Sequence, residues 1–400
     1  MLALRLSIAV AVLAGLAAAA DTIPQEEYRA RREALRKSLA DGVTVLIGEI
    51  ERKGDEPRSG FVQEANFLYL TGWKEPGAIL LLAPPSEETL FLPARNAAQE
   101  RYVGRRAGAD DANIRSVTGF ERVLPAESLE ARLSQALESR QKVDASEAIW
   151  RLRLKKSPRE VELIRKSIEA TIKAHRAAWR RVQPGLFEYQ VAAAIVGSYL
   201  DRGCERSAYV PVVASGPNAT LLHYAVKSRR IERGELVLID AGAECSSYAA
   251  DLTRTVPADG KFTLRQLELY RAVLGAQKEV IKAVKPGMVF DRDTPLSLTR
   301  IASEYLNAHG KDQAGNPLGT RLTHLVGHHV GLEVHDAGRL STSGPLEAGM
   351  VITIEPGVYI EEEAIGIRIE DMVLVTEKGA EVLSSALPKE PEEIERALSK

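Results

Sequence analysis

Two aspartates beside neighbouring apolar runs are the residues of this chain best placed to do chemistry. Asp240 ends the apolar run Leu236–Ile239, a short loop with glycine and serine follows, and a second β-prone run carries Asp251. As the strands of a hairpin, the two runs would lie about 5 Å apart. Two buried carboxylates on neighbouring strands repel each other and need a cation between them. The spacing therefore predicts a cation site.

Further candidate ligands come much later in the chain. They are three histidines and two glutamates: His324, His328, His335, Glu355 and Glu370. Four carboxylates and one imidazole carry too much negative charge for one divalent ion, but they balance two. Mainly oxygen donors with one nitrogen suit Mn²⁺, Co²⁺ or Zn²⁺ better than a soft-metal site would. The set predicts a two-metal hydrolytic centre that activates a water molecule.

These pieces, taken in order, resemble a known family. The matching segments are Asp240 with Asp251-Leu-Thr-Arg-Thr, His324-Leu-Val-Gly-His328-His-Val-Gly-Leu-Glu-Val-His335-Asp, Ile354-Glu355-Pro-Gly and Arg368-Ile-Glu370-Asp. The chain resembles the pita-bread metallopeptidases, and within them the branch of Xaa-Pro aminopeptidase (aminopeptidase P) and prolidase. Each piece alone is a weak signal, whereas five ligands in this order are specific.

The resemblance implies a role for each ligand. Asp240 would bind one metal, and Asp251 and Glu370 would bridge two divalent ions, of which Mn²⁺ is the first expectation. His328 would be the single imidazole ligand. Glu355 would bind the same ion as His328 and would take a proton from the nucleophilic water.

Four further residues are candidate catalytic groups. His324 and His335 match substrate-side histidines that donate hydrogen bonds or move protons. His223 matches a histidine near the scissile bond, although a histidine packed in the sheet is the alternative. Arg368 alternates with Glu370 and so shares its face of a strand. It either orients a carboxylate or the substrate, or it forms a structural salt bridge.

Other polar residues near these motifs are interpreted as structural. His175 continues a buried helical stripe, His309 lies at a helix end, and His329 duplicates the ligand position beside His328. Asp371 points away from the face of Glu370. The acidic run 361–363 is predicted to be a solvated loop.

The resemblance implies an α/β (α+β) protein in two parts. A smaller α/β N-terminal domain, residues 21–155, would precede a pita-bread catalytic domain, residues 156–400, with a curved antiparallel sheet. A helix at 26–39 and strands at 43–47, 79–83 and 90–92 fit the first part. A weak internal repeat fits the second, because Pro184-Gly185 and Pro286-Gly287 each close a long helix.

Residues 1–20 have the pattern of a signal peptide. Arg5 precedes an apolar stretch, and small residues end it at Ala20, where we expect cleavage and export to the periplasm or beyond. The alternative is an uncleaved membrane anchor, but the stretch is shorter than the roughly 20 residues of a spanning helix. No later segment is long and apolar enough to span a membrane. A net charge of −2 without a basic block excludes a nucleic-acid partner.

Cys204 and Cys245 are the only cysteines of the 400-residue chain. Export would permit a disulfide, and the sequence leaves their pairing open. Cys245 lies between the two aspartates, but the hard donors around it favour a structural role over a thiolate ligand.

The resemblance implies hydrolysis of the bond between an N-terminal residue and a following proline, so the expected substrates are peptides with proline second. We also expect a homo-oligomer, a dimer or tetramer. An Xaa-Pro dipeptidase is the nearest alternative. A creatinase-type amidinohydrolase shares the fold but does not need the metal ligands. A metal-free peptide-binding module should lack those ligands, which are all present here.

Overall fold

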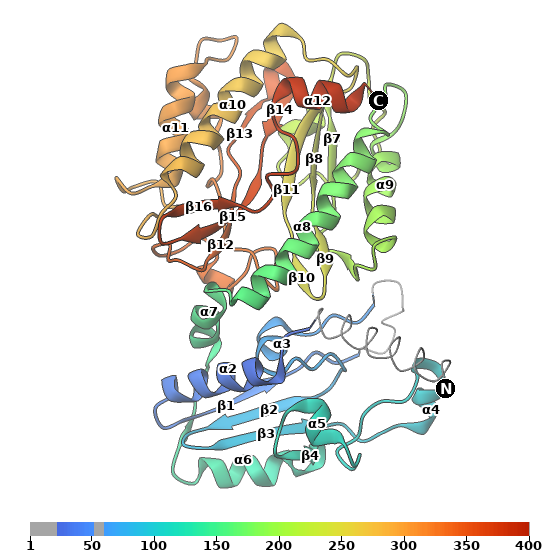
Figure 1. The fold of residues 1–400 in the computed structure, drawn as a ribbon, viewed down its shortest axis with the longest axis vertical. Coiled ribbons are helices and arrows are strands. Elements are labelled where there is room, and N and C mark those ends of the chain that lie inside the picture. The colour runs from blue at the N-terminus through green and yellow to red at the C-terminus, as the bar shows by residue number, and fades with distance from the viewer. Residues whose placement is uncertain (1–21, 52–59, 400) are drawn as a thin grey trace, which may run out of the picture. The chain divides into compact units, whose positions relative to one another are not determined.

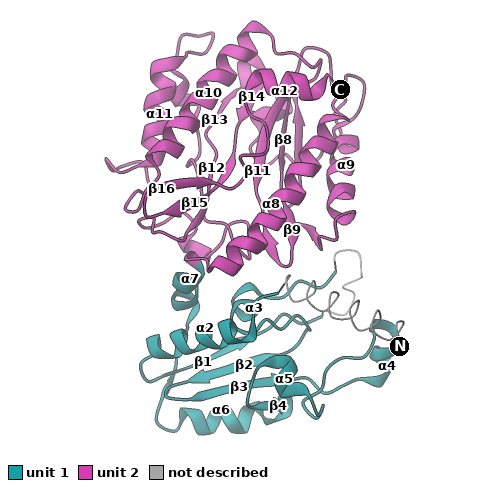
Figure 2. Ribbon diagram, viewed as in Figure 1, with its two compact units in different colours: residues 1–153 teal, residues 154–400 magenta. Residues whose placement is uncertain are grey.

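The computed structural model describes residues 22–51 and 60–399, so the predicted signal peptide lies outside the described residues. The chain divides into two compact units, residues 1–153 and residues 154–400 (Figure 2). No helix in the described ranges combines the length and the apolar character that crossing a membrane requires.

Unit 1 is built on a five-stranded mixed sheet with the strand order β4-β3-β2-β1-β5. Its strands are β1 (Gly42–Ile47), β2 (Ile79–Ala83), β3 (Glu87–Leu92), β4 (Val123–Pro125) and β5 (Gln141–Lys142). Its helices are α2 (Gln25–Ser38), α3 (Ala65–Thr71), α4 (Ala97–Val103), α5 (Ile114–Thr118), the 3₁₀ turn η1 (Ala126–Ser128), α6 (Leu129–Leu137) and α7 (Ser146–Leu154). Val43, Leu81 and Phe91 form a core against α6. The predicted helix and strands of this part are confirmed.

Unit 2 packs two helix pairs around antiparallel strands (Figure 1). The helices are α8 (Pro158–Trp179), α9 (Glu188–Leu200), α10 (Leu264–Ala283), α11 (Leu298–His309) and α12 (Pro391–Leu398). Ser157 and Thr263 cap α8 and α10, each in a capping box with the residue three positions later. The predicted stripe of α8, which includes His175, is buried.

The strands of unit 2 form small sheets in the orders β10-β9-β6, β11-β8-β7, β12-β15-β16 and β13-β14. They are β6 (Arg206–Ser207), β7 (Val212–Ser215), β8 (Leu236–Ala241), β9 (Ala243–Cys245), β10 (Tyr248–Ala249), β11 (Leu252–Pro257), β12 (Val351–Ile354), β13 (Gly357–Ile360), β14 (Ile365–Arg368), β15 (Asp371–Thr376) and β16 (Gly379–Val382). α8 packs against β8–β11, and α10 packs against β12, β14 and β16.

The internal repeat is visible in the backbone. Gly185 follows α8 with φ +92°, and Gly287 follows α10 with φ +90°. A left-handed conformation of this kind favours glycine. A second helix then follows in each half, α9 or α11, and packs on the first. The two halves therefore begin with equivalent helix pairs, as the sequence predicts.

Short 3₁₀ turns connect several strands: η2 (Gly216–Thr220), η3 (Leu318–Arg321), η4 (Gly338–Leu340) and η5 (Glu361–Glu363). The prediction that residues 361–363 form a solvated loop is wrong for Glu363. Its side chain is only 2% exposed, because its carboxylate pairs with Arg265 at 2.8 Å. A local run of acidic residues cannot reveal a partner that lies so far away in the sequence.

Candidate metal centre

Asp240 and Asp251 come from a long hairpin that bends at a glycine. β8 and β11 are antiparallel neighbours with Asp240 opposite Thr253, and the hairpin continues through β9 and β10. A Cβ atom at Gly242 would lie 1.8 Å from the carbonyl oxygen of Ala250. Only glycine therefore permits this close approach of the strands. Both aspartates line the same cavity.

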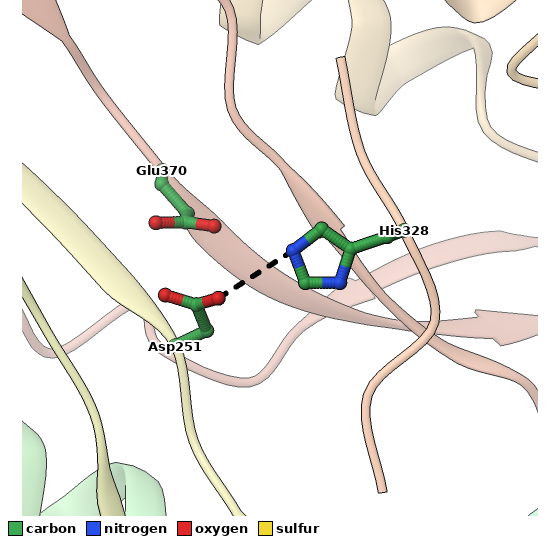
Figure 3. Close-up of side chains that lie close together, drawn as sticks. All are labelled: Asp251, His328 and Glu370. Carbon is green, nitrogen blue, oxygen red and sulfur yellow. Dashed lines mark ion pairs between the residues drawn. The ribbon is translucent and has the colours of Figure 1, made fainter. Parts of the chain in front are cut away.

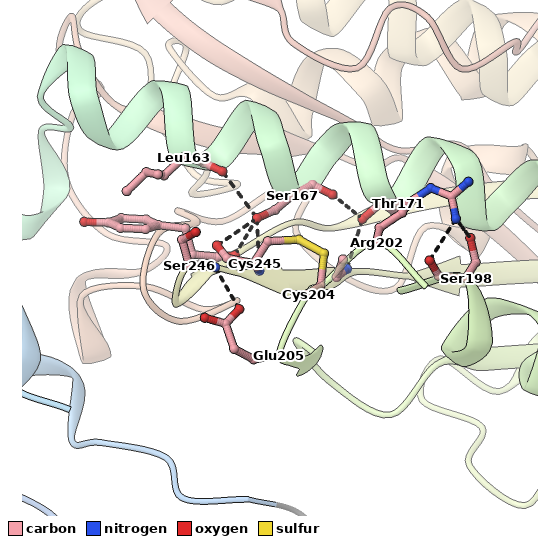
Figure 4. Close-up of a disulfide and its surroundings, with 11 residues drawn as sticks. Leu163, Ser167, Thr171, Ser198, Arg202, Cys204, Glu205, Cys245 and Ser246 are labelled. Atoms are coloured by element: carbon pink, nitrogen blue, oxygen red, sulfur yellow. Dashed lines mark hydrogen bonds between the residues drawn. A yellow bond between two sulfur atoms is a disulfide. The ribbon is translucent and has the colours of Figure 1, made fainter. Parts of the chain in front are cut away.

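The tip of this hairpin is fixed by a disulfide and by hydrogen bonds (Figure 4). Cys204 and Cys245, both buried, are joined across 41 residues, which answers the question that the sequence left open. The backbone N–H of Ser246 donates to Glu205 Oε2 at 2.8 Å. From α8, Ser167 Oγ accepts from the backbone N–H of Cys245 at 3.3 Å. The strands that carry the aspartates are thus held at their far end.

The other three predicted ligands lie in the C-terminal part of unit 2. His328 precedes β12, and its backbone N–H donates to Thr353 Oγ1 at 3.1 Å. Glu355 directly follows β12, and Glu370 lies between β14 and β15. Thr253 on β11 donates to Glu370 Oε2 at 2.7 Å. This bond ties the second group of ligands to the aspartate hairpin.

The predicted residues meet in one cavity of about 520 Å³ within unit 2. All nine candidates line it: His223, Asp240, Asp251, His324, His328, His335, Glu355, Arg368 and Glu370. The apolar part of the cavity wall includes Val212, Leu222 and Tyr224. A mainly apolar cavity with a few convergent polar groups is the usual form of a small-molecule site.

Asp251, His328 and Glu370 point toward one another (Figure 3). They offer one ligand atom each, and these atoms all lie within 4.8 Å of one another. His328 Nε2 is 3.5 Å from Asp251 Oδ2 and 3.6 Å from Glu355 Oε1. Separations of this size leave room for an ion about 2.1 Å from each donor.

The electrostatics of the cluster fit a bound cation. Burial raises the pKa of Asp251, with the charge of Asp240 adding to it, and burial raises the pKa of Glu355 to about 7. Burial and the charge of Asp251 also raise the pKa of Glu370 well above its usual range. Burial alone would lower the pKa of His328, but Asp251 and Glu355 raise it to about 9. Acids crowded in this way bind either protons or metal ions, so the donor set fits divalent cations.

Asp240 is held by two groups from different segments. Tyr209 Oη donates to Asp240 Oδ1 and to Asp251 Oδ1, at 2.5 Å each. Arg368 Nη2 lies 2.5 Å from Asp240 Oδ2, and its Nη1 donates to Tyr359 Oη at 2.8 Å. The ion pair fits both roles predicted for Arg368, because a salt bridge to Asp240 also orients the carboxylate of a predicted ligand.

Tyr209 and Tyr359 are site residues that the sequence analysis missed. Tyr209 lies in an irregular segment between β6 and β7, where no periodicity says which way a side chain points. Tyr359 lies on β13, four positions after Glu355. Residues 355 and 356 belong to no strand and separate β12 from β13, so alternation along one strand does not carry the face of Glu355 to Tyr359.

The three predicted catalytic histidines differ in their surroundings. His324 Nδ1 lies 3.8 Å from Glu355 Oε2, and the ring of His335 lies 4.1 Å from that of His328, centroid to centroid. Burial, followed by nearby positive charge, lowers the pKa of both His324 and His335 to about 4. Both rings are therefore neutral at neutral pH. His223 is exposed, and no described residue forms a hydrogen bond with its side chain.

Known protein families match both units. The model of metallopeptidase family M24 matches residues 162–377, more than half of the chain, and the aminopeptidase P N-terminal domain matches residues 28–144. The chain belongs to metallopeptidase family M24. This membership confirms the family that the ligand motifs predicted.

Relatives in the M24 family cover nearly the whole chain. Xaa-Pro aminopeptidase of Haemophilus influenzae is 36% identical over 94% of this chain and 98% of its own length. That of Escherichia coli is 34% identical over 93% and 97%. The structure of Zn-substituted E. coli aminopeptidase P with product has a TM-score of 0.84 and 30% identity, covering 94% and 98%. The predicted two-domain pita-bread fold is confirmed.

The M24 domain buries three of the polar residues that were interpreted as structural, whereas His309 is exposed at the end of α11. His175 Nε2 lies 2.9 Å from the carbonyl oxygen of Leu252. His329 packs edge-on against Phe290 and does not line the cavity. Asp371, on the side of the strand away from the cavity, binds a buried Arg254 at 2.7 Å. These interpretations are confirmed.

A buried ion pair fixes the segment that carries His328 and His335. Lys156 Nζ lies 3.0 Å from Asp336 Oδ2, and the two side chains are 1% and 2% exposed. The backbone N–H of Asp336 donates to the carbonyl oxygen of His329 at 2.9 Å. The metal-centre histidines thus depend on a charge pair outside the cavity.

Proposed function

We propose that this M24 protein is a dinuclear-metal Xaa-Pro aminopeptidase, which hydrolyses the peptide bond between an N-terminal residue and a following proline. The observation that carries the proposal is the convergence of five donors on one cavity: Asp240, Asp251, His328, Glu355 and Glu370. Relatives of nearly equal length are named Xaa-Pro aminopeptidases, which supports the same activity here.

Two divalent cations, with Mn²⁺ the first candidate, complete the proposal. Oxygen donors outnumber nitrogen donors, as hard divalent ions prefer. When bound, the cations polarise the scissile carbonyl group and lower the pKa of a water molecule. Asp240, Asp251, His328, Glu355 and Glu370 would hold them, because these five donors line one cavity.

Protein groups of the cavity supply the proton and hydrogen-bond chemistry. Glu355 accepts a proton from the attacking water, the general-base role that a carboxylate beside the bound water can fill. His324 lies next to Glu355, but its Nδ1 is 2.7 Å from the carbonyl oxygen of Leu325 and its Nε2 is 2.9 Å from Tyr359 Oη, so it would pass a proton on only after one of these contacts opens. His223 and His335 line the cavity as donors for the substrate carbonyl groups.

Peptide cleavage tests the activity directly. Protein loaded with Mn²⁺ should release the first residue of an Xaa-Pro-Xaa tripeptide and leave the matched Xaa-Ala-Xaa peptide intact. Cleavage of Xaa-Pro dipeptides alone would identify a dipeptidase instead. A protein that binds the tripeptide without cutting it, and retains no metal, would be a binding module.

Loss of a ligand tests the site. We expect Asp251→Asn to lose bound metal, measured by elemental analysis, and activity together. Asp201→Asn is the control, because that side chain is 81% exposed in its ion pair with Arg202 and lies away from the cavity. Full turnover by Asp251→Asn would contradict the assigned ligand set.

We also propose that the protein works outside the cytoplasm after loss of residues 1–20. The disulfide between Cys204 and Cys245 supports this, because such bonds persist in oxidising compartments. N-terminal sequencing of the protein from exported fractions should begin at Asp21. An intact protein starting at Met1 and found only in the cytoplasm would overturn the proposal.

We propose that the protein is a homo-oligomer that uses α9. The exposed side of this helix carries Tyr189, Ala193, Val196 and Leu200, of which the three larger residues are 52%, 37% and 60% exposed. Their helical spacing makes one apolar stripe, which a second copy of the chain would cover. Light scattering should give a dimer or tetramer, and a monomer for Val196→Glu with Leu200→Glu. A monomeric unchanged protein would refute self-association.

A further inference from the structure

A buried glutamate outside the cavity anchors one segment of the cavity wall. Glu188 begins α9 and is fully buried. Its Oε1 accepts hydrogen bonds from the backbone N–H and the hydroxyl of Ser215, at 2.7 and 2.8 Å, and from Asn218 Nδ2 at 3.1 Å. Its Oε2 accepts from Tyr224 Oη at 2.8 Å and from the backbone N–H of Arg229 at 3.1 Å. A buried carboxylate with this many donors needs no cation.

The donors to this carboxylate bracket residues 215–229, and His223 lies inside that segment. The side chain of His223 has no hydrogen bond to any residue that the structure describes, so its ring follows its own backbone. The next residue, Tyr224, is bound to Glu188 through its hydroxyl group and packs with Leu222 against buried apolar residues. The position of the His223 ring therefore depends on this anchor.

The early part of the segment has a second support. A Cβ atom at Gly366 on β14 would lie 1.8 Å from the carbonyl oxygen of Ala219, so the chain around Ala219 rests on that strand. Tyr224, next to His223, is instead held by its hydrogen bond to Glu188 and by apolar packing. Loss of the Glu188 acceptor should therefore loosen the half of the segment that carries His223 more than the half near Ala219.

We propose that Glu188 is a positioning residue for the proposed peptidase reaction, which holds residues 215–229 so that His223 faces the substrate. Glu188 itself does not line the cavity and touches no reacting group. The inference rests on the proposed function, because it assigns Glu188 the task of orienting a group that acts on the substrate. It adds to the proposed function a residue, Glu188, that the lining of the cavity does not include.

A double-mutant cycle separates this role from a general structural one. Glu188→Gln keeps the shape of the side chain, but its NH₂ group takes the place of one carboxylate oxygen. The donors that were bound to that oxygen then face another donor. We expect kcat/KM for an Xaa-Pro-Xaa tripeptide to fall by roughly tenfold to a hundredfold, with the metal content unchanged. In a His223→Ala background, the same change should alter kcat/KM by less than about twofold, because no ring remains to be positioned. Equal losses in both backgrounds would overturn the proposal.

Two further variants control the experiment. Glu160→Gln makes the same change at another buried glutamate, which accepts from Tyr248 Oη and from the backbone N–H of Ser157, at 2.9 Å each. It should keep kcat/KM near the unchanged value. Tyr224→Phe removes one donor but keeps the ring, and it replaces Glu188→Gln in the cycle if that variant does not fold.

Hydrogen exchange gives a readout that needs no catalysis. Backbone amides of residues 215–229 should exchange faster in Glu188→Gln and at the normal rate in Glu160→Gln. Unchanged exchange in this segment would refute the anchor, whatever the kinetics. If the unchanged protein cleaves no proline-second peptide, the proposed function fails, while the exchange rates still decide whether Glu188 holds the segment.

Discussion

Removing the disulfide would measure how much the stability of unit 2 depends on covalent closure of the segment that carries Asp240. Cys204 and Cys245 are 41 residues apart. Closing a loop of that length restricts the unfolded chain, and the chain-entropy model gives about 4 kcal/mol at 25 °C. We therefore expect Cys204→Ala with Cys245→Ala to lower the free energy of unfolding of unit 2 by about 4 kcal/mol. That is a large share of the roughly 5–15 kcal/mol that a domain has.

The assay is urea unfolding without reductant. Hydrogen exchange in peptides from α8 serves as the probe of unfolding, so that unit 2 is observed by itself. With a slope of about 2 kcal/mol/M, the midpoint should move down by about 2 M. The single variant Cys204→Ala also breaks the bond and keeps one cysteine, so it should cost nearly as much as the double variant. A midpoint shift below about 0.5 M in both would refute the closure argument.

Three further predictions concern residues around the metal centre. Lys156→Met leaves Asp336 buried without its cation, so urea unfolding should show a loss of about 3–5 kcal/mol, most of it restored by adding Asp336→Asn; a loss under about 1 kcal/mol would contradict a buried pair. Gly366→Ala must displace the chain at Ala219, so kcat/KM for proline-second peptides should fall, while Gly197→Ala in α9, where an added Cβ meets no atom within 4 Å, should leave it unchanged. Burial lowers the pKa of His175 from 6.5 to about 4, so the unfolded chain binds the proton more tightly than the folded one. The free energy of unfolding should therefore decrease by about 3 kcal/mol as the pH falls from 6.5 to about 4. His175→Gln should flatten that part of the curve, and an unchanged pH profile would argue against the buried neutral ring.

The donor residues were predictable because each belongs to a local pattern. Asp240 ends an apolar strand, Glu355 follows another, and Arg368 and Glu370 alternate on an extended segment. A period of two fixes the face of a side chain without knowledge of the partner strand. The same alternation assigned Asp371 to the opposite side, where it binds Arg254.

Contacts between distant segments could not be predicted in this way. Tyr209 reaches both aspartates from an irregular segment, and no periodic signal gives its direction. Glu188 looks like an ordinary residue at a helix start, and only the folded chain brings Tyr224 and Arg229 to it. The exposed fraction of Glu363 was likewise set by an arginine almost a hundred residues away. Long-range packing decides such cases, and a local pattern carries no record of it.

The donors of the cavity also appear in a fixed order along the chain. Asp240 and Asp251 are made first, on one hairpin, while Glu370 comes last of the five, directly before β15. A growing or translocating chain therefore contains two of the five donors long before the other three have been made. Any ion that requires both groups can be captured only after Glu370 has been made. A chain truncated before Glu370 would therefore remain unable to bind any ion that requires this donor.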